Sequence, residues 1–220
     1  MVKSFERWER EELELTFGLQ QVKDHPILTD WLTATEVITE EEIAKIEPLR
    51  VDLESDISFW NEEEVKIFFI NDLVKLINFK RLNSYKLFAQ RTISANVKDL
   101  KNNDLELRGR IEIVVATGRQ KPRQPFFFIH EYKPIRSSAA NDPEGQLLVA
   151  MVATQALNEG EPRPIYGLYV QGKFWNFVIL SGKEYSISAS YDATKVEDLH
   201  QIVRILKRCK FYIDRFLGLV

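Results

Sequence analysis

The chain has 220 residues, of which 45% are hydrophobic and 29% are charged, and its formal net charge is −3. This composition is typical of a folded globular protein and excludes a disordered or fibrous chain. The single cysteine, Cys209, excludes an internal disulfide and a cysteine-based zinc cluster, and its apolar helical surroundings predict a buried structural thiol. No segment reaches about 18 apolar residues and the first residues form no apolar signal core, so we expect no membrane span and a cytoplasmic location.

The charges are unevenly distributed along the chain. Residues 1–72 carry 19 acidic and 7 basic residues, whereas residues 73–220 carry 14 acidic and 23 basic residues. The basic excess of the later part is compatible with a nucleic-acid partner despite the negative total. The alternative is that the two parts attract each other within the fold.

The first 56 residues are predicted to form an acidic helical N-terminal extension. Residues 4–17 read as a first helix, and a second follows Pro26. Thr39 and Glu42 form a capping box that opens a third helix, expected to run through Ile46. An alternative role for this segment is to bind a partner protein.

Residues 57–220 are predicted to form the main domain. A second capping box, Asn61 with Glu64, opens a long helix, and Asp142 followed by a proline opens another. The expected strands cover residues 85–97, 110–116, 126–133, 165–170, 174–180 and 184–188, and a helix over residues 195–217 closes the chain. This order predicts an α/β fold with a mixed central β-sheet flanked by helices.

Two of these strands carry charged residues among apolar ones. Glu131 and Lys133 end the strand FFFIHEYK and, because side chains alternate, are expected on one face with Phe127 and Ile129. Glu112, on the preceding strand, is expected on the face of Val114 and Ala116. Isolated buried carboxylates are costly and two of them repel, so a cation between them would resolve both costs. Magnesium, which prefers carboxylate oxygens, is the natural candidate, and a structural salt-bridge cluster is the alternative.

Four segments together resemble the PD-(D/E)XK nuclease superfamily. Gly109–Glu112 followed by Glu131–Lys133 is similar to the family's acidic residue on one strand and its (D/E)-x-K on the next. Asn61–Ile70 looks like the first core helix, whose glutamate often completes the metal site. Asp142–Met151 looks like the following helix, where many members place a glutamine near the active site. The resemblance covers about residues 58–215.

The resemblance implies a restriction-endonuclease-like fold with a magnesium-dependent active site. Glu62, Glu112 and Glu131 would hold Mg²⁺, with Mn²⁺ as a substitute. Lys133 would position or polarise the attacking water and stabilise charge, and Gln146 would help to orient these groups. A first-turn polar residue without a catalytic role is the alternative for Gln146.

Helical spacing favours Glu62 over its two neighbouring glutamates. The positions 3, 7, 11 and 14 residues after it are apolar: Val65, Phe69, Leu73 and Leu76. Glu62 therefore shares the apolar face of the helix. The alternative is that all three glutamates only complement the helix dipole.

We therefore expect metal-dependent hydrolysis of phosphodiester bonds in nucleic acid, with DNA as the favoured substrate. Basic residues of the hairpin loop and just after the second strand would contact phosphates: Arg119, Lys121, Arg123 and Arg136. A solvated hairpin tip is the alternative for the loop. A catalytically inactive nuclease-fold module that binds nucleic acid or protein is the second function, favoured by Glu112 where the family usually has Asp. The sequence leaves open whether the chain forms a homodimer.

Overall fold

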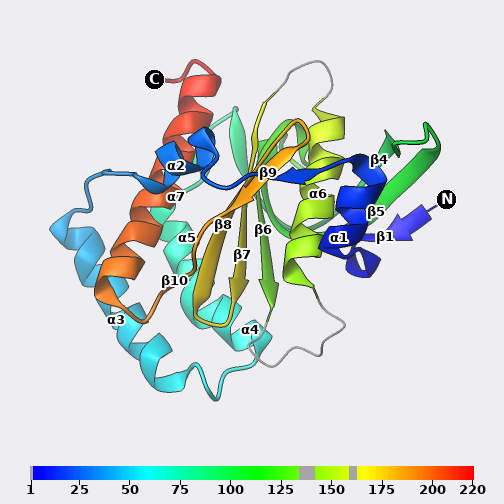
Figure 1. Ribbon diagram of the computed structural model, residues 1–220. Helices are drawn as coiled ribbons and strands as arrows, with labels where there is room; N and C mark the ends of the chain where they lie inside the picture. Colours follow the sequence, from blue (N-terminus) through cyan, green and yellow to red (C-terminus); the bar gives the residue numbers. More distant parts are fainter. Residues whose placement is uncertain (1, 134–141, 159–162) are drawn as a thin grey trace.

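The computed structural model describes residues 2–133, 142–158 and 163–220 (Figure 1). Arg136, which is predicted to contact phosphates, lies outside these residues. The helices are η1 Phe5–Arg7 (3-10), α1 Arg10–Phe17, α2 Pro26–Leu32, α3 Glu40–Asp56, α4 Glu62–Val65, η2 Lys66–Ile70 (π), α5 Asn71–Ile77, α6 Pro143–Leu157 and α7 Val196–Phe216. The strands are β1 Val2–Ser4, β2 Gln20–Gln21, β3 Lys80–Arg81, β4 Tyr85–Lys98, β5 Asp104–Thr117, β6 Arg123–Lys133, β7 Ile165–Gln171, β8 Phe174–Ser181, β9 Glu184–Ile187 and β10 Tyr191–Asp192.

The ten strands of the described residues form one mixed, largely antiparallel sheet. Its main path is β2-β9-β8-β7-β6-β5-β4-β3, with β1 beside β5 and β10 beside β8. The pairs β6–β7, β1–β5 and β2–β9 are parallel, and the others are antiparallel. The β6–β7 pair is parallel because α6 carries the chain back between them. The predicted α/β class, with a mixed sheet flanked by helices, is confirmed.

The two faces of the sheet are covered by different helices (Figure 1). Residues of α2, α3, η2, α5 and α7 form one apolar cluster with strand residues such as Val115 and Phe128. We call this the α7 side. Residues of α1 and α6 form a second cluster with Val114 and Ala116, and we call this the α6 side. Cys209 is buried in the first cluster, as expected, and burial raises the pKa of its thiol.

The N-terminal segment differs from the expected run of helices. Its first α-helix covers only Arg10–Phe17, and strands β1 and β2 pair with β5 and β9. The ring of Phe5 lies directly over Gly109 of β5, where an added Cβ would be 2.1 Å from the Phe5 Cγ atom. The segment is therefore tied to the sheet at two places.

Both predicted capping boxes are present, but their helices differ in extent from the expectation. The helix capped by Thr39 continues through Pro48 to Asp56, well beyond Ile46. A proline inside a helix removes one backbone hydrogen bond, and burial of Ile46 and Leu53 on either side of it offsets that cost.

Candidate functional site

Glu112 and Glu131 lie where strands β5 and β6 part. The last regular pair between these strands toward that end is Ile113–His130. Glu112 and Glu131 are the next residue on each strand, so the antiparallel register brings their backbones to facing positions. The adjacency expected from the sequence is therefore present in the backbone.

The side chain of Glu112 does not share a face with Val114 and Ala116, so that expectation is wrong. Val114 and Ala116 pack on the α6 side, whereas Glu112 contacts Lys66 on the α7 side. The facing residue in β4 is Gln90, which has a φ of +51° and interrupts the regular pairs Ala89–Ile113 and Arg91–Ile111. Such an irregularity redirects a side chain within a strand.

Lys66 gathers three carboxylates from two elements. Its Nζ atom lies 2.5 Å from Glu62 Oε1, 2.9 Å from Glu112 Oε2 and 3.4 Å from Glu63 Oε1. The Lys66 side chain is 13% exposed and that of Glu112 is 20% exposed, whereas Glu63 is 66% exposed. Burial lowers the pKa of Lys66, but hydrogen bonds to Glu62 and Glu112 outweigh it, so the pKa is raised and the ammonium stays charged.

Helix geometry explains why Glu62 and Lys66 meet. They are four residues apart, on one face of the helix. The Asn61 cap fixes the helix start, and the π-helical segment Lys66–Ile70 begins at Lys66 itself. Single π turns inside α-helices recur at functional sites. The sequence reading missed Lys66, and its i+4 spacing from Glu62 was the available signal.

The ring of Tyr132 lies on the same side as Lys66. The Lys66 Nζ atom is 5.7 Å from its centroid, within the range of a cation–π interaction. Burial, together with the charge of Glu62, raises the pKa of the Tyr132 phenol, which stays neutral.

A cavity of about 340 Å³ lies beside this cluster, between the long helix and strands β4 and β5. Its lining residues are Glu63, Lys66, Ile67, Ile70, Asn71, Val74, Lys75, Leu87, Ala89, Gln90, Glu112 and Ile113. A ligand entering it would meet Lys66 and Glu112 directly.

Glu131 points toward the α6 side of the sheet. It pairs in parallel with Tyr169, whose ring packs in the second cluster and whose hydroxyl donates to Glu144 Oε1 of α6 at 2.8 Å. Its neighbour Tyr132 faces Lys66, and alternation then directs Glu131 to the opposite side. Glu131 is buried at 8% exposure. Phe127 packs on the α7 side, because a register shift at Ala116 leaves it out of the regular pairs, so its expected shared face with Glu131 is also wrong.

Gln146 lies in the first turn of α6 and is 5% exposed. Its Nε2 atom is buried and makes no hydrogen bond within the part of the chain that the structure describes. The side-chain amide of Gln146 therefore has a buried N–H donor that is available to a further acceptor. The sequence resemblance predicts that Gln146 orients groups of the site. Helix α6, which carries Gln146, lies on the α6 side of the sheet, the side to which Glu131 points.

The remaining predicted residues lie at the two ends of β6. Lys133 is described only as the last backbone position of the strand, paired with Gln171. Arg119, Lys121 and Arg123 are exposed around the β5–β6 turn, at the far end from Glu131.

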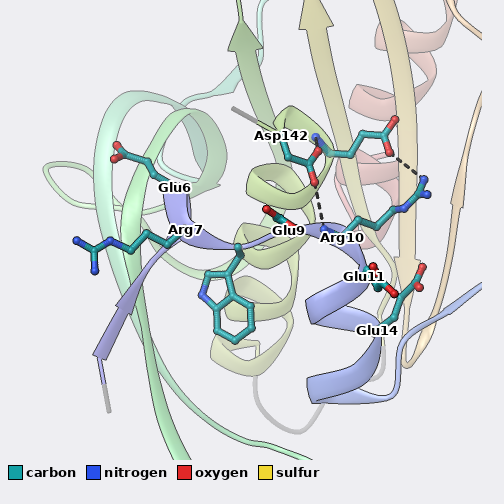
Figure 2. Close-up of a pocket in the computed structure, with 9 residues that line it drawn as sticks. Glu6, Arg7, Glu9, Arg10, Glu11, Glu14 and Asp142 are labelled. Atoms are coloured by element: carbon teal, nitrogen blue, oxygen red, sulfur yellow. Dashed lines mark hydrogen bonds and ion pairs between the residues drawn. The ribbon is translucent and has the colours of Figure 1, made fainter. Parts of the chain in front are cut away.

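A second cavity, of about 790 Å³, lies where the N-terminal segment meets the start of α6 (Figure 2). The backbone N–H of Arg10 donates to Asp142 Oδ2 at 3.1 Å, and its Nη1 atom donates to Glu144 Oε2 at 3.0 Å. Asp142 also caps α6 by accepting from the backbone of Glu144. These contacts attach the N-terminal segment to the first turn of the helix that carries Gln146. The lining residues are Glu6, Arg7, Trp8, Glu9, Arg10, Glu11, Glu14, Asp142 and Glu144.

The described part of the chain holds no closely gathered set of metal-ligating side chains. Within it, no three His, Cys, Asp or Glu side chains gather closely enough to hold an ion. Glu62 and Glu112 do converge on one positive charge, that of Lys66.

A scan against protein-family models matched no family. A search of curated proteins found no similar sequence. Among the described helices, none combines the length and apolar character required to cross a bilayer.

Proposed function

We propose that the protein hydrolyses phosphodiester bonds of nucleic acid, with DNA as the favoured substrate, on a restriction-endonuclease-like fold. One observation carries most of the weight. Glu112 and Glu131 occupy facing positions where two strands of a mixed sheet part, and Glu62 of the preceding helix converges with Glu112 on one cation. The fold assignment itself rests on the sequence resemblance and on this arrangement.

The donor set fits a divalent ion in its chemistry. Glu62 and Glu112, which meet on the α7 side, would hold Mg²⁺ or Mn²⁺ through carboxylate oxygens, which both ions accept. Glu131 was expected to join them, but its side chain points to the α6 side of the sheet and would have to turn to the other face to reach the same ion. When bound, the ion would polarise the phosphate and lower the pKa of a water. The ammonium of Lys66 already pairs with both Glu62 and Glu112, so it would have to move aside as the ion enters.

The other residues of the site act through charge and hydrogen bonding. Lys133, assigned from its place in the E-x-K sequence, would stabilise negative charge on the phosphate or orient the attacking water. Gln146 would use its free amide donor to fix a carboxylate or the water. Glu131, buried at the end of a well-packed strand, would stay in place during the reaction.

A catalytically inactive module that binds nucleic acid or protein is the second candidate. Lys66 favours it, because an internal ammonium that satisfies Glu62 and Glu112 removes the need for a metal ion. The two candidates differ in one observable, the metal-dependent cleavage of DNA.

Cleavage assays on single-stranded, double-stranded and branched DNA, with and without Mg²⁺, test the proposal. Wild type and Glu63→Gln are expected to cleave, whereas Glu131→Gln and Lys133→Ala are expected to lose at least about 100-fold in rate. Glu63 is the matched control because it is the exposed neighbour of Glu62. Cleavage that persists in Glu131→Gln and Lys133→Ala, or that is absent from wild type on every substrate, would reject the catalytic proposal.

A further inference from the structure

We propose that a basic pocket between two turns, β3–β4 and β5–β6, binds backbone phosphates of the nucleic acid and anchors it about four nucleotides away from Glu112. This inference rests on the proposed function for the class of ligand. Its geometry is independent of Glu112 and Glu131. We call it the anchor pocket.

The anchor pocket has a volume of about 440 Å³ and a cationic lining. Lys80, Arg81, Lys86 and Arg119 contribute to it, and none of its lining residues is acidic. Lys80 and Arg119 are exposed, and Lys86 is half-buried. A concave surface lined by cations and by no acidic residue suits a phosphodiester anion.

One of the four cations is neutralised and three are not. Arg81 Nη2 lies 2.9 Å from Asp214 Oδ2, and the Tyr85 hydroxyl donates to Asp214 Oδ1 at 2.7 Å. This bridge to α7 fixes the wall of the pocket. Lys80, Lys86 and Arg119 form no ion pair within the described residues, so their charges are available to a ligand.

The turn that carries Arg119 is sterically fixed. Gly118 has a φ of +101°, and an added Cβ there would lie 2.2 Å from the Lys121 backbone oxygen. Only glycine is tolerated in this conformation. Lys86 is held as well, because its Nζ atom sits 4.8 Å from the centroid of the Phe88 ring. A preformed site loses little entropy on binding.

The anchor pocket and the candidate site follow each other along β4. Tyr85 and Lys86 line the pocket, and Leu87, Ala89 and Gln90 line the cavity that contains Glu112. Lys86 pairs with Ala116, which lies four residues from Glu112 on β5. At about 3.3 Å per residue the separation is roughly 13 Å. A nucleic-acid strand advances about 3.4 Å per nucleotide, so about four nucleotides would span this separation.

The test measures binding of a fluorescein-labelled DNA duplex by anisotropy in EDTA, where metal-dependent cleavage cannot occur. The anchor variant carries Lys80→Glu, Lys86→Glu and Arg119→Glu. The control variant carries Lys23→Glu, Lys101→Glu and Lys183→Glu, three exposed lysines elsewhere, and has the same net charge. A milder variant with Gln at the three anchor positions addresses folding, and all variants are first compared by thermal unfolding.

The anchor variant is expected to bind at least about tenfold more weakly than the control variant, and the Gln variant to lose affinity in the same direction. The slope of log K against log salt concentration is negative, and its magnitude should be smaller in the anchor variant than in the control variant by about 2 to 3. This corresponds to about 0.9 for each phosphate contact that is lost. Equal affinities of anchor and control variants, or no binding by wild type at low salt, would overturn the proposal. Wild type that binds DNA through these residues but never cleaves it would reject the catalytic proposal alone.

Discussion

At the scale of single residues, Lys66 is the partner that two carboxylates of the candidate site share. Its ammonium binds Glu62 and Glu112 with little exposure to solvent. Removal of this ammonium leaves two carboxylates close together without compensation. The same ammonium competes with any metal ion for these oxygens, so stability and metal affinity should respond to it in opposite directions.

The substitution Lys66→Met is expected to lower the free energy of unfolding by about 1–3 kcal/mol, because Glu62 and Glu112 then repel each other. Lys75→Met is the matched control. Lys75 is 75% exposed and pairs only at the surface with Asp72, so its loss should cost less than about 0.5 kcal/mol. Urea unfolding at neutral pH measures both, and equal losses would contradict the assigned role of Lys66.

Asp214 gives a dependence of stability on pH. Burial raises the pKa of this carboxyl, but hydrogen bonds from Arg81 and Tyr85 outweigh it and hold the pKa below the ordinary 3.8. A depressed folded-state pKa adds stability that is present above pH 3.8 and is lost as the pH falls through the folded value. The difference in unfolding free energy between wild type and Asp214→Asn should therefore be constant near pH 6 and shrink below about pH 4. A constant difference down to pH 3 would contradict this.

At the scale of elements, local signals in the sequence predicted most of the main domain. A cap with a glutamate three residues later indicated the long helix that follows Asn61, and the proline after Asp142 indicated α6. Apolar runs indicated α7 and strands β4 to β9. All of these elements are present. Strands β1 and β2 could not be predicted, since three and two residues are too short to show alternation. They exist because β5 and β9 offer parallel partners, a tertiary effect.

The side-chain directions of the site were harder to predict than its elements. Strict alternation was assumed for Glu112, and the positive φ of Gln90 on the partner strand breaks it. Glutamine has no special preference for that conformation, so nothing in the sequence marks the irregularity. The hairpin that brings the two strands together was predictable, but its register was not. Register shifts on either side of Ala116 change the pairing from Thr117–Arg123 near the turn to Ile113–His130, and only this shifted register places Glu112 opposite Glu131.

The packing of the N-terminal segment on β5 can be tested with a double-mutant cycle. Gly109→Ala is expected to destabilise the protein by about 1–3 kcal/mol, because the new methyl group collides with the Phe5 ring. In a Phe5→Ala background the ring is absent and Gly109→Ala should cost much less. Thermal or urea unfolding of the four proteins gives the coupling, and additive effects would show that Phe5 does not pack there.

At the scale of the whole molecule, the uneven charge distribution has two consequences. Acids of the N-terminal region pair with bases of α7: Glu42 with Lys207 at 2.8 Å, and Glu36 with Arg208. Part of the asymmetry is therefore used within the fold, as the alternative reading of the sequence held. The bases of the anchor pocket do not take part in these ion pairs, and Lys80 and Arg119 stay exposed, as the proposed binding of a polyanion requires.

The central claim is that Glu62 and Glu112 form a divalent-metal site from which Lys66 is displaced. Calorimetric titration with Mn²⁺ tests it most directly, on wild type, Glu112→Gln, Lys66→Met and the control Glu63→Gln. Wild type and the control are expected to bind alike, Glu112→Gln at least about tenfold more weakly, and Lys66→Met more tightly than wild type. Identical titrations of wild type and Glu112→Gln, or no heat of binding from any of the four, would contradict the account.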